Sequence, residues 1–565
     1  MIAQVLINRG IREEDVPHYL HTSESDIIHP SVIQSIKDGA KLLIQHIYAG
    51  HKIFIQVDSD CDGYTSAALL INYLNRLFPG FVQNNIVYRF HETKAHGIIF
   101  ETVPKDVKLV IAPDSSSNDY EVHQQLHEAG VDVLVIDHHE AERVSEYACV
   151  INNQLCDYPT KSLSGVGMVY KFCSYIDTLL NVSYADEYLD LVSLGLIADM
   201  MDMRDFETKY FIEAGIEQIR NPYFKGMTIK NAFSLGENIT PFGVAFYIAP
   251  YVNAVTRCGT IDEKTVLFES MLDHRAYEMI SSTKRGCKGQ LEPRVEQACR
   301  MCANVKNRQD KGRDNSLAII ERIIKERELL NNKIIIVTLD SRLAIDKNLT
   351  GLVANKIANQ YQRPTLILNE SKQEDGSIIW EGSGRNYGQS DFSTFRNFLS
   401  SSDYFEYAEG HEGAFGVGIA DSELEEFISY SNEVLKDFDF TAKYYVDFEY
   451  DANLLTGEDI LNIADFDNLW GKCVEEPYVL IKNIKVNASN INLLKGTTIK
   501  ITLPNDITLI KFRTNEAEYN NLYSEMGCIT LNVIGRFQRN SWNGRVTPQI
   551  LIEDYEIVDK VEYYF

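Results

Sequence analysis

The chain has 565 residues, 45% of them hydrophobic and 24% charged, which is ordinary for a folded protein of about three or four domains. This composition excludes a disordered, collagen-like or disulfide-dense chain. Acidic residues number 81 against 54 Lys and Arg, and the net charge of −27 at first argues against binding to nucleic acid or to an anionic membrane.

The sequence carries no signal for a membrane or for export. No apolar run approaches the length of about 18 residues that a membrane-spanning helix requires. The first residues lack the basic and then apolar pattern of a secretory signal. The ten cysteines are scattered, as in proteins whose thiols stay reduced. We therefore expect a cytoplasmic protein that makes no contact with a membrane.

The first half of the chain alternates between strand-like and helix-like patterns. Residues 1–50 are typical of helices. The pattern then predicts strands at 53–57, 107–112 and 131–136, and helices at 64–78 and 119–129. Repeated strand–helix units with short loops indicate a parallel sheet with helices on both faces. In such a sheet, ligands bind beyond the carboxyl ends of the strands.

The second half combines helices, a further α/β segment and a β-rich end. The apolar run 189–198 predicts a buried helix, and residues 260–330 have a mostly helical pattern that connects two bodies. A strand at 333–339 opens the second α/β segment, and short strands after 445 indicate a small β-barrel or sandwich. The predicted fold class is multidomain α/β. The expected divisions are a helical segment (1–50), a parallel-sheet domain (51–258), a helical connector (259–330), a smaller α/β domain (331–445) and a β-barrel (446–565).

Three carboxylates, Asp58, Asp60 and Asp62, follow the first predicted strand at alternating positions. Carboxylates this close repel one another unless a cation neutralises them, so the functional interpretation is a divalent-metal site. The alternative is a polar turn or a cap on the following helix, but a cap requires only one Asp. Gly63 allows a tight turn into that helix, whose N-terminus favours an anion such as phosphate.

Further candidate ligands stand where other predicted elements end. Asp137, His138 and His139 follow the strand at 131–136. Consecutive side chains diverge there, so one His can bind metal while its neighbour faces a substrate. Asp114 ends an adjacent strand, and Asp199 closes the buried helix, where its alternative role is a buried ion pair.

These hard oxygen and imidazole ligands, without a cysteine cluster, suit Mn²⁺ or Mg²⁺. Two ions about 4 Å apart would use all of them and would stabilise a phosphoryl group, so the implied reaction is hydrolysis of a phosphate ester. Several other residues could hold phosphates, and each is a weak signal on its own. They are Asn253, Arg257, Ser383, Arg385 and His411.

The motif from Asp58 to Gly63, together with Asp137-His138-His139, resembles the DHH phosphoesterase superfamily. The rest of the chain is most similar to its RecJ-like exonucleases, which are specific for single-stranded DNA. Further motifs of that family match in order at 164–171, 188–199, 249–257, 382–386 and 409–416. The resemblance implies that 51–258 is a DHH catalytic domain, 331–445 a DHH-associated domain and 446–565 an OB-fold-like domain.

The resemblance also implies roles for individual residues. Two Mn²⁺ or Mg²⁺ ions would be held by Asp60, Asp62, Asp114, His138 and Asp199. Asp58 would support the cluster or bind metal, His139 would contact the scissile phosphate, and Asp137 would orient a His. The residues that would hold DNA phosphates are Asn253, Arg257, Arg385 and His411.

The implied activity is 5′→3′ hydrolysis of single-stranded DNA to 5′-mononucleotides, in DNA repair or recombination. The family implies a single-strand-binding protein or a helicase as partner, and we expect a monomer. Two alternatives remain open. One is a DHH phosphodiesterase acting on cyclic dinucleotides or short oligonucleotides, which would not need the β-rich end. The other is an inactive DHH protein serving as a replication scaffold, which would have lost metal ligands.

Some family positions differ in this chain. Tyr251, Glu409 and Phe415 stand where the family has an Arg, a Gly and a small residue, and the segment 346–353 lacks the family's His. These changes leave the expected ligand set whole. They concern the residues expected to hold DNA.

The negative charge is unevenly distributed. Residues 403–467 hold 18 acidic residues, whereas 284–313 hold nine basic against three acidic ones and 482–549 hold nine against four. Each basic stretch could be a solvated face. The functional interpretation is a narrow basic route by which a single strand reaches the metals, and it reverses the first inference from the net charge.

Overall fold

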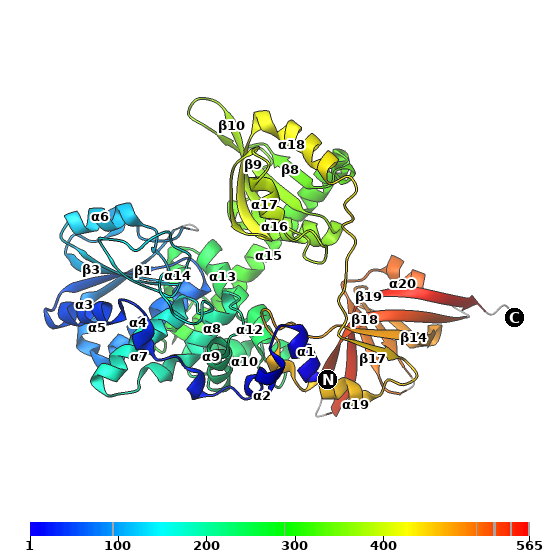
Figure 1. Ribbon diagram of the computed structural model, residues 1–565, viewed down its shortest axis with the longest axis horizontal. Coiled ribbons are helices and arrows are strands. Elements are labelled where there is room, and N and C mark those ends of the chain that lie inside the picture. The colour runs from blue at the N-terminus through cyan, green and yellow to red at the C-terminus, as the bar shows by residue number, and fades with distance from the viewer. Residues whose placement is uncertain (93–94, 288, 504, 524–526, 543–544, 563–565) are drawn as a thin grey trace. The chain divides into compact units, whose positions relative to one another are not determined.

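A computed structural model describes residues 1–92, 95–287, 289–503, 505–523, 527–542 and 545–562. The chain forms two compact units, one of residues 1–303 with 446–565 and one of residues 304–445 (Figure 1). The units divide the chain more coarsely than the five segments expected from the sequence, and those boundaries stay predictions. No helix in the described residues is long and apolar enough to cross a membrane.

The first unit begins with short helices, as expected for residues 1–50. They are α1 (Ile2–Asn8), α2 (Val16–Tyr19) and α3 (Ile36–Tyr48). A five-stranded sheet follows, made of β1 (Lys52–Val57), β2 (Ile86–Phe90), β3 (Val107–Pro113), β4 (Asp132–Asp137) and β5 (Cys149–Asn152). Its order is β2-β1-β3-β4-β5 and every pairing is parallel. The predicted parallel sheet is therefore confirmed, with two further strands, β2 and β5, at its edges.

Helices cover both faces of this sheet (Figure 1). On one face lie α3, α4 (Cys61–Leu77) and α7 (Gly165–Leu180), which pack against the central strands. The other face carries α6 (Tyr120–Glu128) over a core that includes Phe54, Val110 and Val133. The short α5 (Pro79–Asn85) precedes β2. Because both faces are covered, the central strands are apolar along almost their whole length.

A strand order of this kind has a switch point between β1 and β3. The chain passes from β1 outward to β2, and from β3 it builds the sheet in the opposite direction. The loops at the carboxyl ends of these two strands therefore diverge, and open α/β sheets bind ligands at such a point. The sequence places Asp58, Asp60 and Asp62 directly after β1 and Asp114 directly after β3.

A helical layer packs on this α/β body. It comprises α8 (Leu189–Ala198), α9 (Phe206–Glu217), α10 (Pro222–Lys230), α11 (Ala232–Leu235), α12 (Pro241–Tyr247), α13 (Ala249–Cys258) and α14 (Ile261–Ser270). Helix α8 is buried from Asp190 to Ile197 and packs against α4, α7 and α9. The burial expected of the apolar run 189–198 is confirmed over that span.

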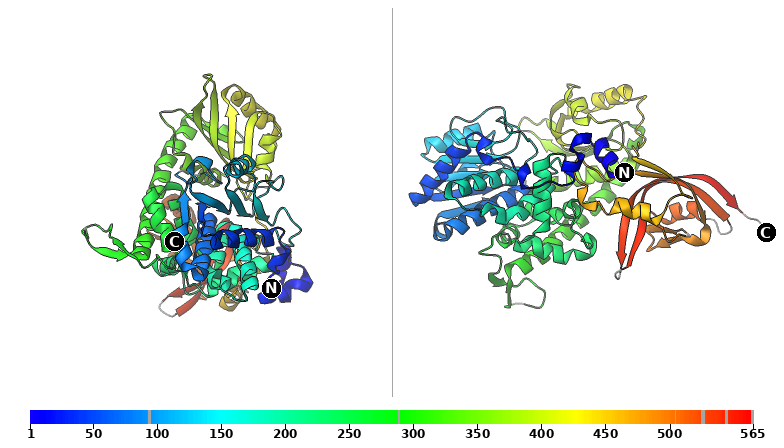
Figure 2. Two further views of the ribbon diagram at one scale, coloured as in Figure 1. Left: turned by 90° about the vertical axis from the view of Figure 1, so that its left-hand side faces the viewer. Right: turned by 60° about the horizontal axis from the view of Figure 1, so that its bottom comes forward.

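The region from 260 to 330 is only partly helical. After α14, a hairpin of β6 (Met279–Ser281) and β7 (Leu291–Pro293) interrupts the predicted helical stretch, and it projects from the first unit in Figure 2. Its turn includes Gly286 and Gly289, both with positive φ, which glycine adopts without strain. The long helix α15 (Arg294–Glu326) then leads into the second unit.

One buried ion pair ties several segments of the first unit together. Lys171 on α7 and Glu207 on α9 are almost inaccessible, and the Lys171 Nζ donates to Glu207 Oε1. Lys171 also donates to the Ile28 carbonyl at 2.7 Å. Glu207 accepts from the Ile28 backbone N–H and the Tyr158 hydroxyl, each at 2.8 Å. These contacts join α7 and α9 to the segments that carry Ile28 and Tyr158.

Removal of one partner of this pair should strongly destabilise the first unit. Glu207→Ala is expected to lower the free energy of unfolding by about 3–5 kcal/mol, because it leaves the Lys171 ammonium buried and unpaired. Urea unfolding followed by circular dichroism measures this change. Glu217→Ala, at the exposed end of the same helix, is the matched control and should stay within about 0.5 kcal/mol of wild type. A loss below about 1 kcal/mol for Glu207→Ala would contradict the assigned role.

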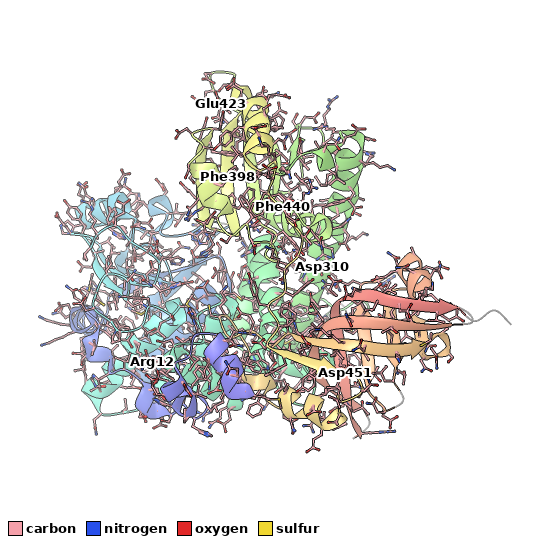
Figure 3. All side chains as sticks on the ribbon, turned by 45° about the vertical axis from the view of Figure 1, so that its right-hand side comes forward. Arg12, Asp310, Phe398, Glu423, Phe440 and Asp451 are labelled. Carbon is pink, nitrogen blue, oxygen red and sulfur yellow. The ribbon has the colours of Figure 1, made fainter. Side chains whose placement is uncertain are left out.

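The second unit is a mixed α/β domain. Its strands are β8 (Ile335–Leu339), β9 (Thr365–Lys372), β10 (Ile378–Arg385), β11 (Phe405–His411) and β12 (Ala414–Ala420), in the order β11-β12-β10-β9-β8. Only β8 and β9 are parallel to each other. The helices are α16 (Lys347–Tyr361), α17 (Phe395–Ser400) and α18 (Asp421–Val434). Phe392 contacts Phe398 and Phe440, both labelled in Figure 3, within an aromatic core.

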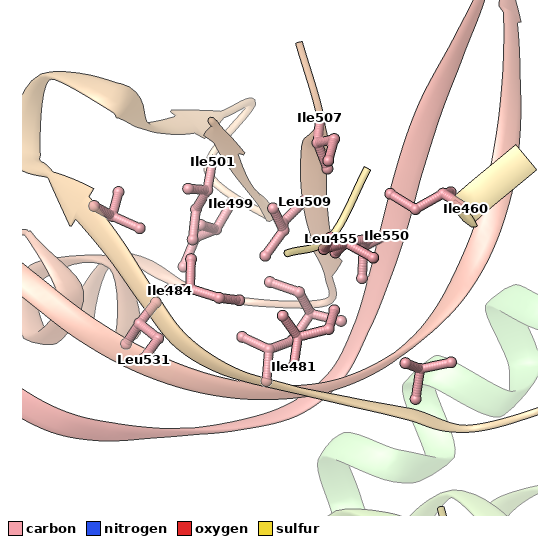
Figure 4. Packing of buried hydrophobic residues seen from close by; sticks show 14 of the residues in the cluster. Leu455, Ile460, Ile481, Ile484, Ile499, Ile501, Ile507, Leu509, Leu531 and Ile550 are labelled. Atoms are coloured by element: carbon pink, nitrogen blue, oxygen red, sulfur yellow. The ribbon is translucent and has the colours of Figure 1, made fainter. Parts of the chain in front are cut away.

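The C-terminal part of the first unit is a curved seven-stranded sheet. Its strands are β13 (Phe448–Asp451), β14 (Val479–Asn487), β15 (Ile491–Leu494), β16 (Thr498–Thr502), β17 (Thr508–Phe512), β18 (Gly527–Trp542) and β19 (Arg545–Glu562), with helices α19 (Gly457–Ala464) and α20 (Glu516–Leu522). The strand order is β13-β14-β18-β19-β17-β16-β15. The sheet curves around a core that includes Ile481, Ile499 and Leu531 (Figure 4). The predicted β-rich end is confirmed.

Candidate metal centre

The three aspartates after β1 have different local partners. Asp60 is the N-cap of α4, and its Oδ1 accepts the Gly63 backbone N–H at 3.0 Å. Asp62 lies in the first turn of the helix, and Asp58 is buried at the end of the strand. A single carboxylate therefore fulfils the capping role, and the other two need another explanation.

The carboxylate of Asp62 is fixed by the start of α7. Its Oδ1 accepts the Ser164 hydroxyl at 2.9 Å and the Val166 backbone N–H at 3.2 Å. Its Oδ2 accepts the Gly165 backbone N–H at 2.6 Å. A carboxylate at a helix N-terminus is favourably placed for both hydrogen bonding and the helix dipole. The sequence did not reveal these contacts, because about a hundred residues separate the partners.

Asp114 and His138 meet beyond the ends of β3 and β4. Asp114 has a φ of +69°, a conformation that Asp tolerates better than most residues. Its Oδ1 lies 3.3 Å from His138 Nε2. Both atoms are buried, and neither makes a hydrogen bond among the described residues. Buried polar atoms are normally paired, so a carboxylate oxygen and an imidazole nitrogen without hydrogen bonds fit the donors of a cation site.

The remaining ligand atoms surround this pair. The Nε2 of His138 is 3.5 Å from Asp199 Oδ2 and 4.0 Å from Asp62 Oδ2. Ligand atoms within 4.8 Å of one another form three groups, namely Asp62 with His138 and Asp199, Asp58 with Asp60 and Asp114, and Asp114 with Asp137, His138 and His139. All five predicted metal ligands thus belong to groups whose ligand atoms converge and could hold a metal ion.

The electrostatics of the cluster favour a bound cation. Burial, together with the charges of Asp62 and Asp60, raises the pKa of Asp114 well above its ordinary value. Burial and the same two charges also raise the pKa of Asp199, and burial raises that of Asp62. Divalent cations would remove this repulsion and permit the carboxylates to stay ionised. Oxygen and imidazole donors of this kind fit Mn²⁺ or Mg²⁺.

Asp137 organises the two histidines that follow it. Its Oδ1 accepts the His138 backbone N–H at 2.7 Å and lies 2.8 Å from His139 Nδ1. Its Oδ2 accepts the Ser117 backbone N–H at 3.1 Å. Burial opposes protonation of His139, but the hydrogen bond and charge of Asp137 outweigh it and raise the pKa of His139 to about 9. The His139 side chain is 54% exposed, and its ring lies beside that of the candidate ligand His138, with centroids 4.4 Å apart.

Loss of this orienting carboxylate should reduce catalysis without removing a ligand. Asp137→Asn is expected to lower the rate of hydrolysis by about 10–100-fold, as for other groups that orient metal-binding histidines. Turnover of a phosphate ester at saturating Mn²⁺ measures the effect. Asp132→Asn, at the opposite end of β4 and exposed, is the matched control. Near-wild-type turnover in Asp137→Asn would refute the orienting role.

Asp58 is engaged by a segment that the sequence did not associate with it. Its Oδ2 lies 2.6 Å from His96 Nδ1, and its Oδ1 accepts the Gly97 backbone N–H at 3.3 Å. His91 Nε2 is 3.8 Å from the same Oδ1. The Lys264 ammonium in turn donates to the His91 carbonyl at 2.6 Å. Of the two roles expected for Asp58, these contacts favour support of the cluster.

Glycines allow the elements of the site to approach closely. A Cβ on Gly165 would lie 2.3 Å from Asp114 Oδ1. A Cβ on Gly195 would lie at the same distance from Asp62 Oδ1, and one on Gly63 would lie 2.6 Å from Asp58 Cβ. Real Cβ atoms do not make such contacts, so any side chain at these positions would displace a carboxylate of the site.

The predicted phosphate-binding residues of the first unit lie on α13. Asn253 Oδ1 accepts the Cys61 backbone N–H at 3.0 Å, so it fixes the loop that carries the aspartates. The Arg257 Nε is buried and has no hydrogen-bond partner in the described parts of the chain. Asn253 is thus brought to the metal loop. Contact of either residue with DNA stays a prediction.

The other predicted phosphate-binding residues lie together in the second unit. Arg385 and His411 both pair in register with Ala414, so they flank one residue at the same end of the sheet. Ser383 is two residues along β10, and its hydroxyl lies 2.9 Å from the Thr350 hydroxyl. Their approach to the metal cluster stays a prediction. Phe415, larger than the residue expected there, is buried against Phe395 and adds to the aromatic core.

The basic stretch 284–313 is largely engaged in ion pairs. Glu292 pairs with Lys284 and Arg300, and Arg294 pairs with Glu269 and Glu278. On α15 within the second unit, Asp310 pairs with Lys306 and Arg313. These acidic partners reduce the positive charge available to DNA. The basic route expected from the sequence stays a prediction.

Comparisons with known proteins agree with this architecture. The model of the DHH family, N-terminal domain, matches residues 52–196, and that of the RecJ OB domain matches residues 446–554. A Bacillus subtilis protein named as the SPbeta prophage-derived single-strand DNA-specific exonuclease YorK is 38% identical over 563 residues, which cover 99% of this chain and 96% of that protein. The single-stranded-DNA-specific exonuclease RecJ of the same species is 25% identical over 98% of this chain and 67% of its own length.

Solved structures support the fold. The crystal structure of RecJ from Thermus thermophilus in complex with Mn²⁺ matches 99% of this chain and 76% of that chain, with a TM-score of 0.72 and 17% sequence identity. The Mg²⁺ complex of the same protein matches with a TM-score of 0.63. The multidomain α/β fold and the OB assignment of the C-terminal sheet are thereby confirmed.

Proposed function

Because this chain belongs to the RecJ family of single-strand-specific DNA exonucleases, we propose that it is a metal-dependent exonuclease. It hydrolyses single-stranded DNA from the 5′ end and releases 5′-mononucleotides. The proposal includes two divalent cations, Mn²⁺ or Mg²⁺, as cofactors. A family member that had become a scaffold would have lost ligands, whereas all the expected ones are here.

The observation that carries the proposal is the pair of atoms without hydrogen bonds, from Asp114 and His138, beyond the ends of β3 and β4. Asp114 Oδ1 and His138 Nε2 face each other at 3.3 Å in a buried site with no hydrogen bond in the described structure. Further aspartates provide ligand atoms close to this pair. A purely structural cluster would pair these atoms with donors or with one another. A site that holds cations explains both the burial and the missing hydrogen bonds.

Each residue then has a physical role in the reaction. Asp60, Asp62, Asp114, His138 and Asp199 would hold the ions, which supply Lewis-acid activation of water and of the phosphoryl group. His139, held by Asp137 at its Nδ1, would contact a phosphate oxygen. Asp58 would fix the first loop through His96. Asn253, Arg257, Ser383, Arg385 and His411 would hold the phosphates of the strand.

The cellular setting belongs to the same proposal. An enzyme that digests single strands acts in DNA repair or recombination, where a helicase or a single-strand-binding protein presents its substrate. We expect it to act in the cytoplasm as a monomer.

Hydrolysis assays with Mn²⁺ test the activity. The substrates are a long 5′-phosphorylated single strand, the same sequence as a blunt duplex, and a dinucleotide. We expect mononucleotides from the single strand and little product from the duplex. Preferred cleavage of the dinucleotide would favour a small-substrate phosphodiesterase, and no cleavage of any substrate would refute an enzymatic role.

A further inference from the structure

Two stacked phenylalanines are exposed on α12. The rings of Phe242 and Phe246, one helical turn apart, have centroids 4.3 Å apart and planes at 28°. The residues are 45% and 60% exposed. Apolar groups gathered on a surface often mark a binding site. A stacked aromatic pair that is open to solvent offers π-faces to a planar ligand.

The helix that carries this pair is firmly held. Its other side is buried through Pro241, Gly243 and Val244. Thr240 caps the helix by accepting the Gly243 backbone N–H at 3.0 Å. A Cβ on Gly243 would lie 2.9 Å from a Leu235 methyl group, so α12 and α11 are closely packed. The two rings are therefore positioned before any ligand arrives, which lowers the entropy cost of binding.

The pair belongs to the helical layer that shapes the metal centre. Helix α12 packs against α8, which ends at the candidate ligand Asp199. It is followed by α13, on which Asn253 binds the backbone of the metal loop. The seven residues from Phe246 to Asn253 span at most about 25 Å even if fully extended. A strand bound at the metals can thus reach the pair within a few nucleotides.

The charge of this segment favours an anionic partner. Residues 220–258 contain four basic residues, Arg220, Lys225, Lys230 and Arg257, against the single acidic Glu237. The chain as a whole carries a net charge of −27. A positive segment in such a protein attracts polyanions more than it attracts acidic proteins or itself. Exposed aromatic side chains together with basic side chains are typical of proteins that bind single-stranded nucleic acid. Within this segment, Lys225 and Lys230 on α10 are exposed, whereas the Arg257 Nε is buried.

We propose that Phe242 and Phe246 form a base-stacking surface that holds the single strand on the 3′ side of the scissile phosphate. This inference rests on the proposed nuclease function. It adds a physical reason why the enzyme would act on single-stranded rather than double-stranded DNA. Bases in a duplex are already paired and stacked within it, so only an unpaired base can place its face on these rings.

Binding measurements in EDTA, which prevents hydrolysis, test the stacking surface directly. The probes are a fluorescently labelled oligothymidylate and a strand of the same length made of abasic residues. The variant Phe242→Leu/Phe246→Leu keeps the apolar surface but removes the rings. We expect it to bind oligothymidylate about 5–100-fold more weakly than wild type and to bind the abasic strand equally well.

Two controls define the result further. Phe246→Tyr retains a ring and should keep nearly wild-type affinity for oligothymidylate. Tyr48→Leu alters an exposed aromatic residue elsewhere on the unit and should leave that affinity unchanged. In hydrolysis assays, the double variant should raise KM and leave kcat almost unchanged. Normal affinity of the double variant for oligothymidylate, or an equal loss for the abasic strand, would overturn the inference.

Failure of this inference is distinguishable from failure of the proposed function. If wild type and double variant hydrolyse single strands with the same KM, the stacking surface is refuted and the nuclease function stands. If wild type hydrolyses no strand, the nuclease function is refuted, and the base-dependent difference in binding still decides whether the rings stack on bases.

Discussion

Replacement of Asp114 by asparagine should slow the hydrolysis of single-stranded DNA by about a thousandfold or more. Asp114 is shared by two groups of candidate ligands, and asparagine removes its charge with little change in shape. Metal ions contribute several kcal/mol of charge stabilisation to such reactions, and a loss of about 4 kcal/mol corresponds to about a thousandfold in rate. Single-turnover assays at saturating Mn²⁺ measure the effect.

Affinity for the strand should largely survive this substitution, because the proposed contacts with phosphates and bases lie elsewhere. His138→Ala should give the same result. Asp106→Asn is the matched control, since Asp106 directly precedes β3, at the opposite end of the strand, and is exposed. If Asp114→Asn retained more than about a tenth of the wild-type rate, the ligand assignment would be wrong.

Addition of a single methyl group at Gly165 should also impair catalysis severely. A Cβ there would lie 2.3 Å from Asp114 Oδ1, and Asp114 is confined on its other side by His138. The carboxylate must therefore move by roughly 1 Å, and a displacement of that size costs about a hundredfold in rate. The measurement is kcat of Gly165→Ala on single-stranded DNA.

Gly167→Ala is the matched control for this substitution. Gly167 lies on the same helix, and a Cβ there would contact side-chain carbons of Leu163 and Leu196 at 3.2 Å or more. It should turn over near the wild-type rate. Unchanged turnover in Gly165→Ala would show that the carboxylate can move without consequence, which is incompatible with a closely defined site.

The sequence predicts the parallel sheet and the candidate ligands because both depend on local patterns. Short apolar runs ending in Asp or His mark β1, β3 and β4, and the rule that ligands bind at carboxyl ends brings their last residues together. The strands β2 and β5 were not predicted. Both lie at an edge of the sheet. The residues of β2 are mostly half-buried or exposed, and β5 has only four residues, so each gives a weak pattern.

The supporting contacts of the site could not be predicted, because they join distant parts of the chain. Asp62 depends on the first turn of α7, and Asp58 depends on His96 beyond β2. In both cases the contacting residues are too far apart in the sequence for the repeat of a helix or strand to relate them. Gly165 illustrates the same limit, since only the folded chain reveals that its missing side chain makes room for Asp114.

The sequence contains a pattern that indicates the hairpin between α14 and α15. Gly286 and Gly289 lie only three residues apart in a segment whose overall pattern predicts a helix. Glycine disfavours a helix interior. The positive φ values at both positions account for the turn. The basic character of 284–313 was read correctly from composition. Its pairing with Glu292 and Asp310 depends on tertiary structure.

Equilibrium binding of Mn²⁺ to the purified chain is the most direct test of the central claim, which is that the Asp–His cluster holds two catalytic cations. Dialysis or electron paramagnetic resonance should find two Mn²⁺ ions per wild-type chain and a reduced number in Asp114→Asn, with hydrolysis of single strands appearing only as the sites fill. Absence of Mn²⁺ binding, or equal binding by wild type and Asp114→Asn, would contradict the account.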